Sequence, residues 1–246
     1  MTILSDLLLV LIAYIYVFAT ILIPVYLKKK ERISKFQARK GVHLFAGLTV
    51  LTTPYFTWPW WAVIIAGSLT ILVFMSSKKS KVKQLKELYE SIGEEAEEKV
   101  GYLQGPFHYC ISITVLILVF VIFAPREMYF PIAGILLMII SDTLASVFGK
   151  RYGRHHIKIP WIKGIRSIEG SLAFFISGYI LCLLAFTLLG VTNPLTQIHI
   201  GLVDALIYSL ITSLLATFIE IFSPSTWDDL TVPILTTIII FLLTLI

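Results

Sequence analysis

Charged residues are scarce in this sequence, and apolar side chains take their place. Only 14% of the 246 residues are charged, whereas 57% are hydrophobic, and the mean hydropathy is +0.88. A soluble domain of this length has no interior large enough to hide so much apolar surface, so the bilayer must act as the solvent. We therefore expect one integral membrane domain over residues 1–246, with no soluble module long enough to fold alone.

Cysteine is rare, and several common site motifs are missing. The only two cysteines, Cys110 and Cys182, lie inside apolar segments, which argues against a structural disulfide. No set of His and Cys residues has zinc-site spacing. No Gly-x-x-x-x-Gly-Lys-Ser/Thr element occurs, which excludes a P-loop. Any phosphate chemistry in this chain must therefore be built from other residues.

Long apolar runs without strict alternation predict membrane-spanning helices, because each run is near the ~20 residues that a crossing needs. The segment 41–56 is short and contains His43, so a half-helix or re-entrant piece is an alternative there. The expected architecture is all-α, with eight transmembrane helices at about 3–27, 41–56, 58–75, 106–124, 129–148, 170–190, 200–222 and 230–246.

The loop after the third predicted span has helical periodicity of its own. Leu85, Leu88, Tyr89 and Ile92 recur at the spacing of one helix face, among charged residues. This pattern predicts an amphipathic helix that lies at the membrane interface, with a solvated charged side.

Lysine and arginine gather in alternate loops. All of them except Arg126 fall in three stretches, residues 28–40, 78–99 and 150–166. Arg126 falls in a loop on the opposite side of the predicted membrane. Because positively charged loops remain in the cytoplasm, this asymmetry predicts that the first, third, fifth and seventh loops between the predicted spans are cytoplasmic. It places both termini outside.

Acidic residues on the same face are more informative, because the positive-inside rule does not require them. Asp142, Glu220 and the pair Asp228–Asp229 stand at the cytoplasmic ends of predicted spans. An unpaired acid deep in a span costs on the order of 2–3 kcal/mol, so such residues usually face a polar interior. Structural ion pairs with nearby Lys and Arg are one interpretation, and a functional site is the other. Charge placement alone leaves both open.

The stretch from Asp142 to Ser171 concentrates the residue types that a polyphosphate with a metal ion would need. A helix would place Asp142 beside a small-residue surface formed by Ala145, Ser146 and Gly149. The loop that follows carries six cations and no acid between Lys150 and Arg166. Gly149 and Gly153 bracket two of these cations, and glycine allows close approach to a ligand or, alternatively, to a neighbouring helix.

The sixth predicted span begins with a Ser/Gly-rich segment. Ser167 is a candidate N-cap, and the free N–H groups of a helix N-terminus suit phosphate oxygens. An ordinary cap explains Ser167 equally well. Glu169 is an acid that follows a basic loop, where it could hold a metal or orient a lysine.

Four motif-like stretches follow one another along the chain: Arg39-Lys40-Gly41-Val42-His43 (Arg-Lys-x-x-His), residues 141–153 (Asp-x-x-Ala-x-x-x-Gly-x-x-x-Gly), residues 163–171 (Lys-Thr/Ser-x-Glu/Ala-Gly-Ser/Thr), and Glu220 with residues 228–233 (Glu…Asp-Asn-Leu-Thr-x-Pro). In this order they resemble the motifs of the CTP-dependent polyprenol kinase group, which includes dolichol kinases, phytol kinases and the yeast-type diacylglycerol kinase. Asp229 departs from the pattern, because the family usually has Asn there.

This resemblance implies transfer of the CTP γ-phosphoryl group to a membrane lipid alcohol of the polyprenol, dolichol or phytol type, with Mg²⁺ as cofactor. The physical interpretation agrees, because phosphoryl transfer needs mainly positioning and charge neutralisation. The expected catalytic residues are Asp142, Lys163, Glu169 and Glu220; the expected metal ligands are Asp142, Glu220, Asp228 and Asp229; and the expected nucleotide contacts are Lys150, Arg151, Gly149, Gly153, Arg166, Ser167, Gly170, Ser171, Arg39, Lys40 and His43.

The sequence leaves two rival functions open. A cytidylyltransferase that makes a CDP-lipid would need a similar charged, Mg²⁺-dependent face. A transporter would place its site near the midplane on broken helices, whereas these charges cluster at one face. The expected partners are a lipid alcohol, CTP and membrane lipids, without nucleic acid; the oligomeric state is open, with a homodimer as one option.

Overall fold

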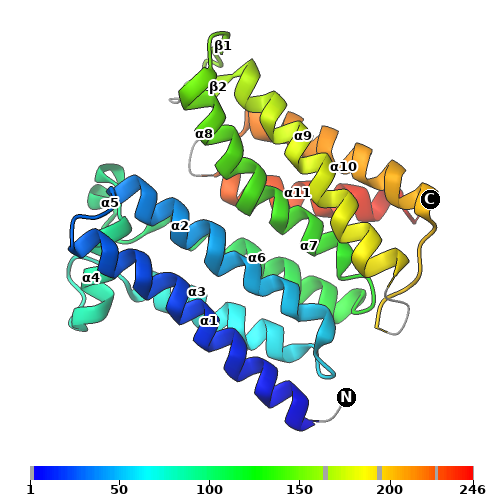
Figure 1. The fold of residues 1–246 in the computed structure, drawn as a ribbon, viewed down its shortest axis with the longest axis horizontal. Coiled ribbons are helices and arrows are strands. Elements are labelled where there is room, and N and C mark those ends of the chain that lie inside the picture. Colours follow the sequence, from blue (N-terminus) through cyan, green and yellow to red (C-terminus); the bar gives the residue numbers. More distant parts are fainter. Residues whose placement is uncertain (1–2, 163–165, 193–195, 225–226, 246) are drawn as a thin grey trace. The chain divides into compact units, whose positions relative to one another are not determined.

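The computed structural model describes residues 3–162, 166–192, 196–224 and 227–245, apart from the side chains of Glu95, Ala96 and Glu98. Apart from one short hairpin, all regular structure among these residues is helical (Figure 1). The chain divides into two compact units, residues 1–114 and 115–246. The expectation of a single catalytic domain stays a prediction.

The first unit is built from helices around a small apolar core. Its elements are α1 (Ile3–Lys29), α2 (Lys35–Gly47), a 3₁₀ helix (Leu48–Tyr55), α3 (Trp60–Met75), α4 (Lys83–Ile92), α5 (Glu95–Val100) and the first half of α6 (Gln104–Phe123). The core includes Ala38 of α2, Val73 of α3, Tyr89 of α4 and the buried Leu103 just before α6. Ser34 caps α2 through a capping box with Gln37.

The amphipathic helix predicted in the third loop is present as α4. Leu88, Tyr89 and Ile92 are buried in the core of the first unit, as the helical spacing predicts. The apolar side packs against α1, α2 and α3 of the same unit. Only its charged side therefore remains for contact with water or lipid head groups.

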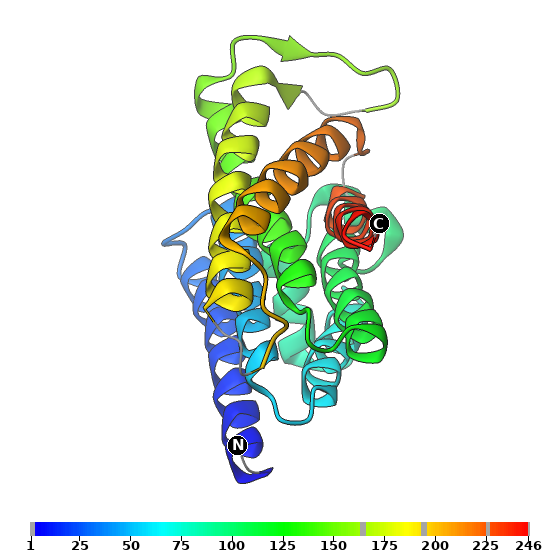
Figure 2. The ribbon, with the colours of Figure 1, turned by 90° about the vertical axis from the view of Figure 1, so that its right-hand side faces the viewer.

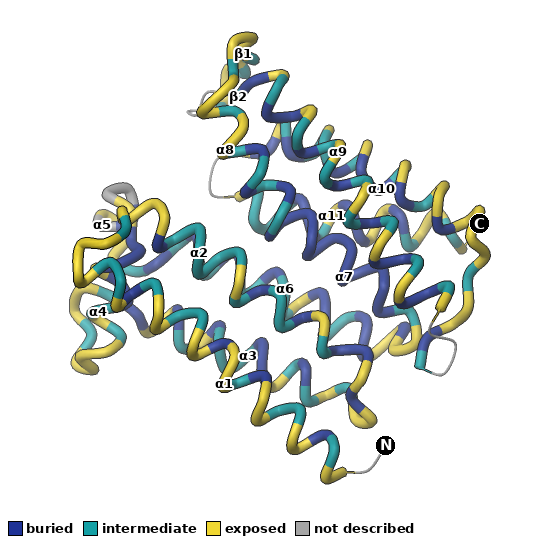
Figure 3. The backbone as a smooth tube through the Cα atoms, viewed as in Figure 1, coloured by how far each residue is buried: buried dark blue, intermediate teal, exposed yellow. Residues whose placement is uncertain are grey.

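The second unit surrounds one fully buried helix. It comprises the rest of α6, α7 (Tyr129–Leu136), a π-helical turn (Leu137–Ser141), α8 (Asp142–Tyr152), β1 (His156–Ile157), β2 (Arg166–Ser167), α9 (Ile168–Ala185), a second π-helical turn (Phe186–Val191), α10 (Leu202–Phe222) and α11 (Asp228–Leu243). Every residue of α7 is buried, which Figure 3 shows as an unbroken dark-blue segment. Helices α9 and α11 both pack on α7.

The hairpin β1–β2 lies at the shared end of α8 and α9 (Figures 1 and 2). The two strands are antiparallel, with His156 opposite Ser167 and Ile157 opposite Arg166. This register brings Arg166 and the start of α9 back to the end of α8. The hairpin thus places the basic loop beside the helix that carries Asp142.

Five helical segments of the described chain are long and apolar enough to cross a membrane, which fits a polytopic membrane protein. The expected count of eight is not confirmed. The predicted span 41–56 is divided between α2 and the 3₁₀ helix, and α11 has only 16 residues. The five segments are Ile3–Lys29, Gln104–Phe123, Tyr129–Tyr152, Ile168–Val191 and Leu202–Phe222, and Trp60–Met75 is a shorter apolar helix.

Candidate active site

The second unit contains a cavity of about 430 Å³ that opens among the ends of its helices. Such a volume is within the range of small-molecule sites. The cavity is formed by α8, the hairpin, the start of α9, the end of α10 and the start of α11. It is lined by Asp142, Ala145, Ser146, Gly149, Lys150, Gly153, His156, Arg166, Ser167, Gly170, Ser171, Glu220 and Asp228.

Arg166 organises the charges of this cavity. One terminal nitrogen of its guanidinium pairs with Glu220 of α10, and the other lies 3.6 Å from an Asp228 oxygen at the start of α11. The second nitrogen also donates a hydrogen bond of 2.8 Å to the Ser223 carbonyl. The side chains of Arg166 and Glu220 are only 13% and 7% exposed. The hairpin therefore presents a largely desolvated cation to two acidic helix ends.

The pKa of Arg166 reflects two opposing causes. Burial lowers the pKa from its ordinary value, and the carboxylates of Asp228 and Asp142 raise it in opposition. Because arginine titrates far above neutral pH, the guanidinium stays charged. The cavity thus holds a permanent positive charge surrounded by three acids.

Arg166 and Glu220 each keep an unused hydrogen-bonding atom. The Nε of Arg166 and the Oε2 of Glu220 are buried and have no hydrogen-bond partner among the described residues. A buried polar atom without a partner costs about 1–3 kcal/mol. These two atoms are therefore suited to a ligand that offers an acceptor to Arg166 and a donor or a cation to Glu220.

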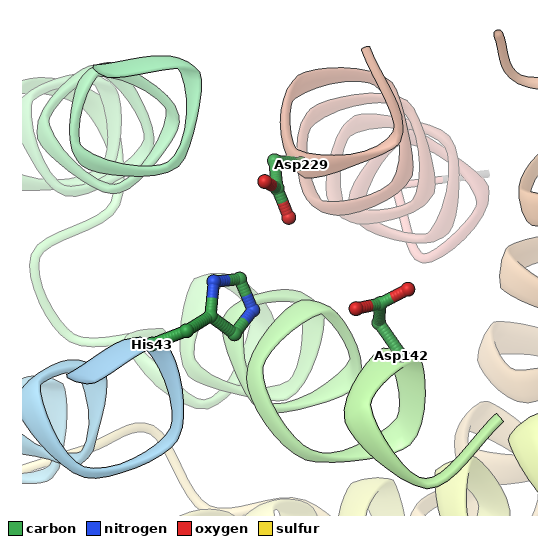
Figure 4. Close-up of side chains that lie close together, drawn as sticks. All are labelled: His43, Asp142 and Asp229. Carbon is green, nitrogen blue, oxygen red and sulfur yellow. The ribbon is translucent and has the colours of Figure 1, made fainter. Parts of the chain in front are cut away.

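A second pair of acids lies next to this cluster. Figure 4 shows Asp142 of α8 and Asp229 of α11 with their carboxylates turned toward each other, and carboxylate oxygens of the two approach within 4.8 Å. Two carboxylates at this separation repel each other unless a cation lies nearby. Asp228 and Glu220 line the same cavity as Asp142, and carboxylate oxygens are the ligands that Mg²⁺ prefers. The residues present thus fit the expected metal ion.

Helices α8 and α9 approach closely because glycine occurs at both sides of their contact. A Cβ on Gly170 would lie 3.0 Å from the Ala145 carbonyl oxygen and 3.3 Å from the Gly149 Cα. Ser167 is the N-cap of α9, and its Oγ accepts the Gly170 N–H at 3.1 Å. The predicted N-cap is confirmed. Gly149 and Gly170 allow the close helix contact and also line the cavity, so their expected contact with a nucleotide stays a prediction.

Gly170→Ala should therefore separate α8 from α9 and lower the stability by about 1–3 kcal/mol, as overpacking typically does. The added Cβ meets backbone atoms of α8, which cannot rotate away. Thermal unfolding of the purified variant measures this loss. Gly67→Ala is the matched control, because its Cβ would meet only a Thr114 methyl group at 4.0 Å. Equal melting temperatures for the two variants would contradict the prediction that the close contact of α8 and α9 requires glycine at position 170.

Several predicted residues lie away from the lining of this cavity. Arg151 is exposed near the end of α8, with its guanidinium 5.3 Å from the centre of the Tyr152 ring. Glu169 contacts His155 instead, with 2.8 Å between Oε1 and the ring Nδ1. Lys163 lies outside the described residues. The catalytic roles of Lys163 and Glu169 and the nucleotide contact of Arg151 stay predictions.

Three further predicted residues belong to α2 of the first unit. Arg39 lies in an ion pair with Glu97, at 2.9 Å. His43 packs its ring against Tyr109 with 4.4 Å between ring centres. Lys40 is half-buried between them along the same helix. Their assignment as nucleotide contacts also stays a prediction.

One lining residue was not singled out by the sequence. His156 lines the cavity because β1 pairs with β2, whose Arg166 and Ser167 also line it. No sequence signal marks a two-residue strand of this kind. Ala145 and Ser146 do line the cavity beside Asp142, as helical spacing predicts.

Comparison with known proteins shows similarity to dolichol kinases and phytol kinases. No protein-family model matches the chain. The chain is 32% identical over 182 residues to dolichol kinase from Saccharomyces cerevisiae. The aligned residues make up 72% of this chain and 33% of the yeast protein. It is 29% identical over 196 residues to phytol kinase from Synechocystis sp., covering 80% of this chain and 74% of that protein. A probable chloroplastic phytol kinase from Triticum aestivum is 26% identical over 226 residues, or 88% and 70% of the two chains.

These similarities over most of the chain support a place in the polyprenol and phytol kinase family. It spans about a third of the length of the yeast dolichol kinase and about 70% of the wheat protein. Within the described part of the second unit, the family-like motifs at residues 141–153, 166–171, Glu220 and Asp228 all contribute to one cavity.

Proposed function

We propose that this chain is a lipid-alcohol kinase that transfers the γ-phosphoryl group of CTP to the hydroxyl of a polyprenol-type or phytol-type alcohol. The observation that carries the proposal is Arg166, held between Glu220 and Asp228 in a cavity that Asp142 also lines. The names of the similar proteins support a lipid alcohol as acceptor. The preference for CTP follows from the family resemblance.

The cavity contains the parts that phosphoryl transfer requires. Arg166 has a buried Nε that can donate to a phosphate oxygen, and Lys150 contributes a second positive charge. The start of α9 lines the same cavity through Ser167, Gly170 and Ser171, and a helix N-terminus favours anions. Positioning and charge neutralisation of this kind supply most of the catalysis in phosphoryl transfer.

Magnesium fits the carboxylates of the same unit. Asp142, Asp228 and Glu220 line the cavity, and Asp229 adds a fourth carboxylate near Asp142. When bound there, Mg²⁺ would neutralise phosphate charge and orient the nucleotide. Asp229 stands where the family usually has Asn, so we assign the principal metal-binding role to Asp142 and Asp228.

The proposed reaction forms a bond between the alcohol oxygen and the γ-phosphorus, while the bond from the γ-phosphorus to the bridging oxygen breaks. CDP leaves, and a carboxylate of the cavity accepts the hydroxyl proton. The Glu220 Oε2 is the candidate acceptor, because it is buried without a partner among the described residues. An isoprenoid chain would remain in the lipid while its hydroxyl reaches the cavity.

Transfer of labelled phosphate tests the proposal. Purified protein is incubated with Mg²⁺, a panel of lipid alcohols and CTP labelled at either the α or the γ phosphate. We expect label from the γ position, and none from the α position, in the lipid extract. Label from the α position would instead indicate a cytidylyltransferase, and no label from either position with any alcohol would contradict the proposed activity.

A further inference from the structure

The first unit contains a second buried ion pair, which the proposed activity does not explain. Arg39 of α2 pairs with Glu97 of α5, with 2.9 Å between Nη1 and Oε2. The Glu97 side chain is 2% exposed and the Arg39 side chain 16%. Removing two charges from water costs several kcal/mol per ion, so such a pair persists only when its remaining hydrogen bonds are satisfied.

The surroundings of Glu97 satisfy it fully. Its carboxylate accepts the backbone N–H groups of Glu94 and Gly105, each at 2.8 Å, in addition to the Arg39 guanidinium. Glu94 is the N-cap of α5, and Gly105 lies in the first turn of α6. A single carboxylate therefore joins three segments that are separate in the sequence.

Arg39 is satisfied in the same way. It donates to the Ile92 carbonyl at the end of α4 at 3.2 Å, and its Nε lies 3.4 Å from a Glu94 oxygen. A Cβ on Gly105 would collide with the guanidinium, so glycine at this position leaves the space that Arg39 occupies.

The contrast with the pair in the second unit indicates different roles. Arg166 and Glu220 each keep a buried atom without a partner, whereas no buried polar atom of Arg39 or Glu97 lacks one within the described chain. An ion pair with unused atoms is suited to a ligand. An ion pair whose buried atoms are all used is suited to holding backbone segments together.

A second contact joins α2 to α6, one helical turn further along each helix. His43 follows Arg39 by four residues, and Tyr109 follows Gly105 by four. The Tyr109 hydroxyl donates to the His43 carbonyl at 2.8 Å, and the two rings pack together. Because residues four apart share a helix face, both contacts join the same two faces of α2 and α6.

We propose that Arg39 is a positioning residue rather than a nucleotide ligand. With Glu97 it forms a latch that fixes α2 against α5 and α6, and so sets the orientation of Lys40 and His43 on the same helix. The latch itself is independent of the activity. Its consequence for catalysis, through Lys40 and His43 of the family-like motif, rests on the proposed function.

Thermal unfolding of the purified protein in detergent tests the latch. Arg39→Gln and Glu97→Gln should each lower the melting temperature by roughly 6–20 °C, because each leaves a buried charge without its partner. The double variant should melt no lower than the worse single variant, because the second change removes the orphaned charge. Glu90→Gln is the control, since Glu90 is 57% exposed and its nearest cation lies 3.9 Å away.

Nucleotide binding separates the latch from a direct role. If Arg39 acts only through the latch, Arg39→Gln and Glu97→Gln, each measured below its melting temperature, should lower CTP affinity by the same factor, because both changes release α2 and with it Lys40 and His43. A loss of CTP affinity at least tenfold greater in Arg39→Gln than in Glu97→Gln would overturn the proposal. If wild type binds no CTP, the proposed function fails, and the melting temperatures still decide the latch.

Gly105→Ala provides a test that changes no charge. The added methyl group displaces the Arg39 guanidinium, so the latch predicts a lower melting temperature for this variant as well. If Arg39→Gln does not fold, the melting temperature of Gly105→Ala decides whether the latch is present. Wild-type melting of Gly105→Ala would count against the latch.

Discussion

Asp142→Asn should abolish phosphoryl transfer while the protein remains folded, with a fall in kcat of at least ~10²–10³-fold. Asparagine keeps the size of the side chain and removes its negative charge. Asp142 lines the cavity, and its carboxylate also approaches that of Asp229. Loss of its charge therefore removes a principal candidate ligand for Mg²⁺. The rate of transfer from γ-labelled CTP, measured beside the melting temperature, checks this expectation.

Asp204→Asn is the matched control for this substitution. Asp204 is an exposed acid in the first turn of α10, at the opposite end of that helix from Glu220. Its carboxylate accepts the Gly201 N–H, so its loss should cost about 1 kcal/mol of stability or less, without a change in kcat. A wild-type rate in Asp142→Asn would remove Asp142 from the site.

Arg166→Gln should have the second large effect, on both stability and nucleotide binding. The substitution leaves Glu220 buried without its cation, which typically costs about 3–5 kcal/mol. It also removes the buried Nε that we assign to a phosphate oxygen, so CTP affinity should fall by about tenfold or more. The two effects are measured by thermal unfolding and by equilibrium binding of labelled CTP.

The double variant Arg166→Gln/Glu220→Gln separates a structural ion pair from a ligand site. Removing both charges should restore part of the lost stability, because no buried carboxylate of the pair then lacks its cation. It should not restore transfer. Recovery of activity together with stability would mean that the pair is only structural. Arg154→Gln, at an exposed cation of the same loop, controls for the loss of one positive charge.

Much of the second unit was predictable because its acids occur where lipid penalises them. Asp142, Glu220 and Asp228 stand at the ends of apolar runs, and these positions predicted that the three acids face a polar interior. In the structure all three line one cavity. The N-cap at Ser167 was also predictable, since the cap depends on residue types only three positions apart.

The first unit was harder to predict from its sequence. In the sequence, Arg39 belongs to the basic stretch 28–40, where the positive-inside rule accounts for every cation equally. Its partner Glu97 is 58 residues away, among other acids of an amphipathic segment. Nothing in composition or periodicity distinguishes that acid from its neighbours. Burial and two backbone hydrogen bonds distinguish it, and these depend on tertiary packing.

The segment 41–56 shows why the number of spans was not confirmed. Its apolar residues are numerous enough for a short span, but the chain forms a tighter 3₁₀ helix over Leu48–Tyr55 instead of continuing α2. Apolar length alone does not distinguish a straight helix from two joined pieces. The alternative of a half-helix or re-entrant piece at this position stays a prediction.

Binding of Mn²⁺, used as a paramagnetic probe for Mg²⁺, tests the central claim that the acids of the second unit hold a metal ion with the nucleotide. We expect electron paramagnetic resonance to show tight binding of Mn²⁺ to the wild-type protein in the presence of CTP. Asp142→Asn and Asp228→Asn should each abolish that binding, and Asp204→Asn should retain it. Unchanged Mn²⁺ binding in Asp142→Asn and Asp228→Asn would contradict the assignment of the site.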